Sequence, residues 1–200
     1  MVTKFPLAGL LIAAALLSGC TVVDLDENGQ PIIPKDPTEQ TGYRDQTPQQ
    51  VAEENWDSMV VKGAQARALS WSDMKAKSST LKPGSSVFVQ ASGTVSAVSD
   101  AADRERLLTV VINGETVPVS IGPVIRSNAI RDAAEFKFED FTNQVQFARL
   151  TKALNQHAVK QLPTVDAQWV GKPVQMVLAV TVQPDKVQDA VAVSLKQEQP

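Results

Sequence analysis

Apolar and polar residues alternate along five stretches of the chain, with the period of two that is typical of β-strands with one buried face. These stretches are residues 87–97, 107–112, 115–121, 174–182 and 187–195. Gly93 stands in the middle of the first stretch, where it predicts a bulge or a sharp bend. We therefore expect a sheet whose first strand is long and bent.

The second and third stretches are joined by Asn113-Gly114, a dipeptide that favours a two-residue hairpin turn. A turn of this kind places Val110 opposite Val117 and gathers the apolar residues of both strands on one face. Pro118 lies on the other face and lacks a backbone donor. We expect its strand to be a sheet edge over part of its length.

Other segments have apolar residues at spacings of three and four, which predicts helices. The first opens with a capping box from Thr47 to Gln50, and the second spans 70–77. The third follows Asp140, which is the expected N-cap, and ends at Pro163. The apolar stripes are Trp56, Met59 and Val60; Trp71 and Met74; and Phe147, Leu150, Leu154, Ala158 and Leu162.

From residue 85 onward the order is strand, strand, strand, helix, strand, strand, which is that of an OB-fold. We expect a mainly β protein with α elements (α+β): a five-stranded OB-fold-like Greek-key barrel with a helix between strands 3 and 4, preceded by one or two N-terminal helices. An unrelated α+β sandwich is the main alternative. The predicted parts are a lipoprotein signal peptide (1–19), a lipidated Cys and flexible tether (20–46), N-terminal helices (47–80) and the barrel (81–200).

The first twenty residues have the pattern of a bacterial lipoprotein signal peptide. Lys4 precedes an apolar run over residues 5–17, and the lipobox Leu17-Ser18-Gly19-Cys20 closes it. Because Cys20 is the only cysteine, we expect it to carry acyl chains such as palmitate that anchor the protein in a bilayer. A plain secretory signal is the alternative. Thr21 after the cysteine favours the outer membrane if the source is a diderm bacterium, and we expect the chain to face the periplasm.

Composition and charge narrow the function classes. The 200 residues carry a net charge of -3 and the pI is about 5.2, which argues against binding to nucleic acid. One Cys and one His cannot form a His/Cys zinc site, and a lipidated thiol is no nucleophile. His157 borders an apolar stripe and has no triad partners nearby, so we interpret it as a boundary residue. We expect no enzyme, no cofactor and no metal.

Residues 121–126, 130–133 and 138–144 read IGPVIR, IRDA and FEDFTNQ. With the lipobox and the helix-then-barrel order, they resemble the signature of a family of predicted bacterial periplasmic lipoproteins of unknown function (domain of unknown function 2291). The resemblance implies a periplasm-facing lipoprotein and an association with carbohydrate ABC-transport systems. The family has no established catalytic residues, so the resemblance assigns none here.

One group of polar side chains lies between the third and fourth strands: Arg126, Arg131, Asp132, Asp140, Asn143 and Gln144. As a ligand or partner site, the arginines would bind carboxylate or phosphate and the amides would suit sugar hydroxyls. As a structural network, the arginines would pair with the aspartates and the amides with loose backbone, which is the commoner arrangement. Trp56 and Trp71 also have two interpretations. They could form a platform on which a sugar stacks, or they could pack the N-terminal helices onto the barrel.

These observations predict a non-enzymatic envelope lipoprotein that acts as a binding or accessory module, with an unknown protein or sugar-like small-molecule partner. By analogy with OB-folds, residues 101–106 and 183–186 lie near its binding surface. The alternative is a structural or assembly protein of the cell envelope without a small-molecule ligand.

Overall fold

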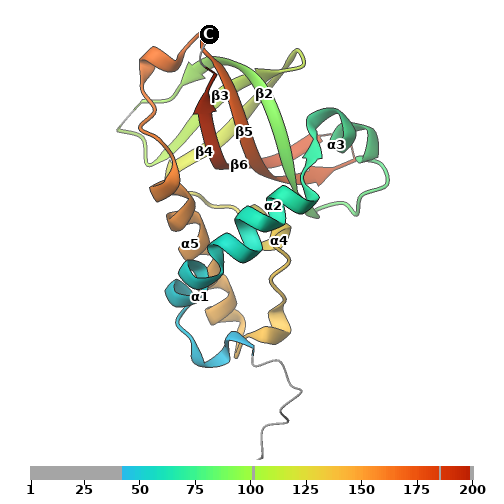
Figure 1. The fold of residues 1–200 in the computed structure, drawn as a ribbon, viewed down its shortest axis with the longest axis vertical. Helices are drawn as coiled ribbons and strands as arrows, with labels where there is room; N and C mark the ends of the chain where they lie inside the picture. Colours follow the sequence, from blue (N-terminus) through green and yellow to red (C-terminus); the bar gives the residue numbers. More distant parts are fainter. Residues whose placement is uncertain (1–41, 101, 185, 199–200) are drawn as a thin grey trace, which may run out of the picture. The chain divides into compact units, whose positions relative to one another are not determined.

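Consecutive helical segments open the described part of the protein (Figure 1). The computed structural model describes residues 42–100, 102–184 and 186–198, so the predicted signal peptide, Cys20 and most of the tether lie outside it. Helix α1 (Pro48–Asn55) begins with the predicted capping box and continues through the π-helix η2 (Trp56–Val61) into α2 (Lys62–Arg67). Within the described ranges, no helix combines the length and apolar character needed to cross a bilayer.

Five strands close a β-barrel (Figure 1). They are β2 (Ser86–Val98), β3 (Glu105–Ile112), β4 (Glu115–Pro123), β5 (Pro173–Gln183) and β6 (Lys186–Gln197). The order β2-β3-β4-β6-β5 returns to β2, and the short strand β1 (Leu69–Ser70) adds to β2 in parallel. The structure thus confirms a mixed α and β protein with a five-stranded barrel, N-terminal helices and a helix between the third and fourth barrel strands.

The β3–β4 hairpin has the predicted register, with Val110 opposite Val117. Asn113 and Gly114 have φ values of 49° and 85°, as a turn with two left-handed residues requires. On its other side β4 pairs with β6 only at Ser120. The edge character predicted from Pro118 is therefore present over most of this strand.

Of the bulge or sharp bend predicted at Gly93, the bulge lies at another position. The register of β2 shifts between Val95 and Ala97, whereas Gly93 pairs regularly with Val174. A Cβ at Gly93 would lie 2.7 Å from Cγ1 of Val110 and would also meet the carbonyl oxygen of the next residue. Glycine is needed here because β3 approaches β2 closely at this point. The first part of β2 pairs with β5, and from Thr94 onward β2 pairs with β3.

The segment between β4 and β5 contains α4 (Ala129–Ala133), η3 (Phe138–Asp140), α5 (Gln144–Gln161) and η4 (Ala167–Trp169). Asp140 does not cap α5, because it ends the short helix η3 and the chain is extended at Phe141. The N-cap is Asn143, whose side chain accepts a hydrogen bond of 2.9 Å from the backbone N–H of Gln146. Helix α5 ends before Pro163, as predicted.

Side chains fill the interior of the barrel. Trp71 and Met74 of α3 (Trp71–Lys77) and Trp169 of η4 belong to the same apolar core as Leu108 and Leu178 of the strands. A second core lies between the helices and the outer face of the barrel, and its members include Trp56, Phe88, Leu150, Ala179 and Val191. The packing interpretation of the tryptophans is confirmed, and a ligand site must be sought outside the barrel interior.

Residues 42–46, which the sequence pattern placed in the tether, are folded here and contain the short helix η1 (Tyr43–Asp45). The Nε2 group of Gln146 donates to the carbonyl oxygens of Tyr43 at 3.0 Å and Gln46 at 2.9 Å. Its Oε1 accepts from the backbone N–H of Thr142 at 2.8 Å. We call residues 42–46 with Gln146 the N-terminal clamp; it fastens the start of the folded unit to the first turn of α5.

Candidate functional site

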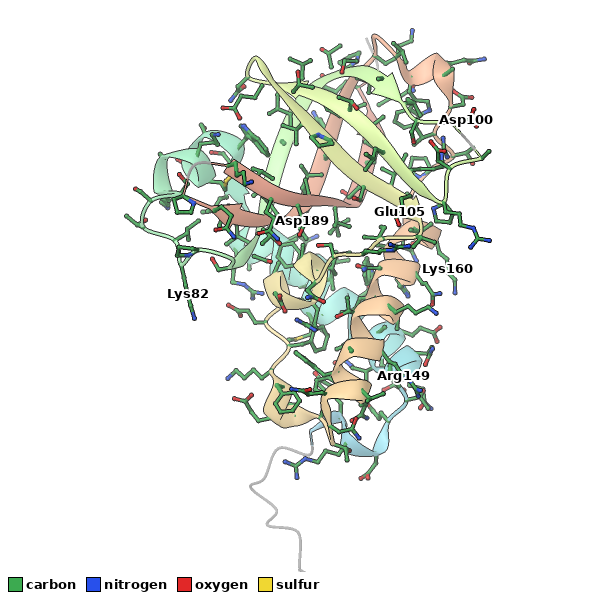
Figure 2. The ribbon with its side chains drawn as sticks, turned by 180° about the vertical axis from the view of Figure 1, so that it is seen from behind. Lys82, Asp100, Glu105, Arg149, Lys160 and Asp189 are labelled. Carbon is green, nitrogen blue, oxygen red and sulfur yellow. The ribbon has the colours of Figure 1, made fainter. Side chains whose placement is uncertain are left out.

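A hollow of about 250 Å³ lies where the barrel meets the C-terminal end of α5. Strand β3 contributes Arg106, β4 contributes residues 121–123, α5 contributes Val159, and the segment after the helix contributes residues 162–165. Figure 2 shows this junction, with Glu105 at the end of the barrel that faces α5 and Lys160 on the last turn of the helix. The hollow is thus built from elements far apart in the sequence.

Gly122 allows this junction to form. Its φ of +87° favours glycine, and a Cβ at this position would lie 3.1 Å from Cγ1 of Val159 and closer still to Cγ2. Without a side chain here, Val159 packs directly onto the backbone of β4. Pro163 then stops the helix, and the following residues pass over Arg106 to close one side of the hollow.

Arg106 is the chemical centre of the hollow. Its Nη2 donates to the carbonyl oxygen of Val165 at 2.9 Å, while its Nε is buried and has no hydrogen-bond partner among the described residues. No carboxylate in the described part of the chain forms an ion pair with it. A guanidinium is permanently charged and has five N–H donors. The hollow is therefore lined by a cation that no described carboxylate neutralises.

The carboxylate next to Arg106 in the sequence is engaged elsewhere. Glu105 accepts from Nε of Arg126 at 2.9 Å, and the two side chains are 53% and 79% exposed. An ion pair as exposed as this contributes little to stability. Successive side chains of a strand point to opposite faces, so Glu105 is directed away from its neighbour Arg106 independently of this pair.

Arg131 and Asp132, two members of the predicted polar site, lie together. Nη2 of Arg131 is 2.7 Å from Oδ1 of Asp132, and its Nη1 donates to Oγ1 of Thr151 at 3.0 Å. The guanidinium carbon also lies 4.0 Å from the ring centre of Phe147. Only 13% of this arginine side chain is exposed. These contacts tie α4 to α5.

The other four members lie in two further places. Arg126 is at the barrel end with Glu105, whereas Asp140, Asn143 and Gln144 lie around the N-terminal end of α5. No hydrogen bond or ion pair within the described ranges joins these groups to each other or to Arg131. Ligand binding by the six residues stays a prediction; within the set Arg131 pairs with Asp132, and Arg126 pairs with Glu105, which lies outside the set.

The surface predicted from 101–106 and 183–186 is divided between opposite ends of β2. Val98 at one end of this strand pairs with Leu108, and Ser86 at the other end pairs with Thr181. Figure 2 shows Asp100 and Lys82, which flank β2, on opposite sides of the barrel. Only Arg106 of the predicted surface reaches the hollow described here, and residue 101 lies outside the described ranges.

Arg106 was not among the six residues of the predicted polar site, although the sequence pattern of its strand marks it as unusual. Leu108, Val110 and Ile112 are buried, so the even-numbered positions of β3 face the barrel core. Arg106 is the next even-numbered position, and a charged residue at the end of a core-facing series is unusual. The partners that form the hollow around it could not be found in this way, because they come from β4 and from the end of α5.

His157 packs against Trp56, with ring centres 4.5 Å apart, and its Nε2 lies 3.3 Å from Nε2 of Gln161. Burial lowers the pKa of His157, and Lys160 lowers it further against the opposing effect of nearby carboxylates. This arrangement matches the predicted boundary residue. Among the described residues, no group of three or more His, Cys, Asp or Glu side chains is arranged to hold a metal ion.

A family model described as "Predicted periplasmic lipoprotein (DUF2291)" matches residues 10–196. The match includes the helices, the hollow at Arg106 and the barrel except for the last residue of β6. A search of curated proteins found no match.

Proposed function

Because the chain belongs to this family of predicted periplasmic lipoproteins, we propose that it is a membrane-anchored, non-enzymatic binding module that takes a small molecule beside Arg106. The anchor is the acylated Cys20, and Thr21 directs the protein to the outer membrane in a diderm cell. The described unit then faces the periplasm.

The observation that carries this proposal is the state of the Arg106 guanidinium. A buried donor without a partner costs about 1–3 kcal/mol, and more in a charged group. Nε of Arg106 is such a donor, although it is not itself accessible, and no described carboxylate pairs with this arginine, which lines the hollow. Small-molecule sites are concave, mostly apolar and equipped with a few polar groups that orient the ligand. The hollow is concave, and Arg106 is the charged group among lining residues that are mostly apolar.

The connectivity of the barrel supports an OB-fold as its fold type. Its strands follow the order β2-β3-β4-β6-β5 and close on β2, with helix α5 between the third and fourth strands. OB-folds bind ligands on their second and third strands, which correspond to β3 and β4 here. Arg106 lies on β3 and Gly122 on β4, so the hollow borders the strands where an OB-fold is expected to bind.

A screen of thermal unfolding tests the proposed function. The full chain, purified from membranes in detergent, is heated with sugars, sugar phosphates, amino acids and organic acids, because a ligand of the native state raises the unfolding temperature. The exposed Thr164 at the hollow is replaced by Phe to fill it. We expect at least one compound class to raise the unfolding temperature of the wild type and not that of Thr164→Phe. Equal shifts in both proteins, or none in either, would refute the proposed site.

An association with a carbohydrate ABC-transport system is the wider role suggested by the family resemblance. Cross-linking in intact cells, followed by purification through the lipoprotein, tests it by identifying the neighbouring proteins. We expect a permease or a sugar-binding protein among them. Cell-wall assembly proteins in their place would contradict the transport role.

The second candidate function is that of a structural or assembly protein of the envelope. The filled barrel interior favours it, because Trp71 and Trp169 pack into the core and leave the barrel solid. This candidate predicts that no compound in the screen shifts the unfolding temperature and that an envelope protein co-purifies in fixed proportion.

A further inference from the structure

We propose that the hollow at Arg106 selects small monocarboxylates with an apolar body, in preference to phosphates and to sugars. This inference rests on the proposed function, which makes the hollow a binding site, and it adds the chemical class of the ligand. Three properties of the lining support it: its charge, the orientation of the neighbouring helix, and the composition of its walls.

The charge of the lining matches one negative charge on the ligand. Arg106 is the only charged residue among those that line the hollow. A carboxylate is planar and takes two parallel hydrogen bonds from a guanidinium, which makes this pair short and strong. A monocarboxylate bound at Arg106 would neutralise the arginine and accept hydrogen bonds from the guanidinium N–H groups that reach the hollow.

The orientation of α5 disfavours a phosphate group. The hollow lies at the C-terminal end of this helix, beside Val159 and Leu162, where the helix dipole has its negative end. Phosphates are commonly bound at the opposite end of a helix, where free N–H groups point at the anion. A dianion placed here would face carbonyl groups with a single arginine to compensate its charge. A single carboxylate charge is better matched.

The walls of the hollow suit hydrocarbon and do not suit a sugar. Ile121, Val159, Leu162 and Val165 supply apolar surface, and Thr164 supplies the only side-chain hydroxyl of the lining. The lining contains no aromatic ring on which a sugar could stack. A sugar would therefore lose the hydration of several hydroxyls without gaining partners. With a volume of about 250 Å³, the hollow fits a body of a few carbons.

Titration calorimetry on the full chain in detergent tests the inference with three probes: sodium butyrate, inorganic phosphate and glucose. We expect butyrate to bind and the other two to show no saturable heat. Arg106→Gln removes the charge but keeps a donor for Val165, and it should weaken butyrate binding at least tenfold. The matched control Arg126→Gln removes the same charge from a nearby exposed arginine and should change the affinity less than twofold.

Thr164→Phe provides a second variant that leaves Arg106 in place, so the inference stays testable if Arg106→Gln does not fold. It should also abolish butyrate binding. The inference fails if phosphate or glucose binds in preference to butyrate, or if neither variant weakens the binding of butyrate. If another compound class binds the wild type but not Thr164→Phe, the proposed function stands and only the ligand class is wrong. If no compound binds at all, both fail.

Discussion

Replacing Gln146 with alanine tests whether the N-terminal clamp secures the start of the folded unit. The Gln146 side chain makes short hydrogen bonds to Tyr43, Gln46 and Thr142, between 2.8 and 3.0 Å long, and a longer one of 3.4 Å to the carbonyl oxygen of Arg44. Alanine removes all of them and keeps the helix, because the cap from Asn143 reaches the backbone N–H of residue 146.

The expected loss follows from these bonds. Three short hydrogen bonds contribute about 1 kcal/mol each in net terms. The released carbonyl groups are only partly buried, so water replaces some of the lost interaction, and we expect the clamp to lose about 2 kcal/mol. A change of this size raises the population of the open clamp about 30-fold.

Limited digestion with trypsin measures this opening, because Arg44 lies inside the clamp. The bond after Arg44 should be cleaved mainly when the clamp opens, so the initial rate of this cleavage, followed by mass spectrometry, reports the open population. We expect Gln146→Ala to raise that rate about 30-fold. Cleavage after Lys152, in the interior of α5, should keep its wild-type rate.

The matched control is Gln144→Ala, which changes an exposed glutamine on the same turn that makes no side-chain hydrogen bond within the described ranges. It should leave the cleavage after Arg44 unchanged. A rise of less than threefold in Gln146→Ala, or an equal rise in both variants, would refute the assigned role of the clamp.

Three further predictions concern titration and packing. Burial and then the charge of Asp140 raise the pKa of Tyr43, the only tyrosine, so its absorbance should titrate above pH 10; a midpoint at or below 10 would contradict the structure. Because burial lowers the pKa of His157 below 6.5, the unfolded chain binds a proton that the native one does not as the pH falls from 7.5 to 5.5. The free energy of unfolding should drop over this range, and it should drop less in His157→Gln. If the free energy of unfolding, measured by urea titration at each pH, changes equally in both proteins, this prediction is wrong. Gly93→Ala should lower the free energy of unfolding by about 1–3 kcal/mol, because its Cβ meets the backbone of β3, while Ser92→Ala should change it little.

Local patterns predicted the barrel well where one short segment determines the geometry. The Asn113-Gly114 turn and the alternation of apolar residues specify the register of β3 and β4 without help from the rest of the chain. Thr47 and Gln50 likewise form the expected capping box. In each case, the residues that decide the structure are neighbours in the sequence.

The sequence was less informative where contacts between segments that are far apart in the chain determine the local structure. Gly93 looks like a bulge because glycine in a strand often marks one, but its reason is the approach of another strand. Asp140 and Asn143 are both good helix caps, and the short helix η3 decides between them. The hollow at Arg106 needs Gly122 and Val159 to meet, which no periodicity in the chain indicates.

The position of the clamp has a mechanical consequence. Residue 42 is the point where the folded unit continues from the N-terminal segment, so tension transmitted along that segment first loads the hydrogen bonds of Gln146. Val159 lies 13 residues further along α5, and at a rise of 1.5 Å per residue this is about 20 Å away. A pull on the N-terminal end of the described unit would therefore act on the clamp before it reaches the end of α5 that borders Arg106.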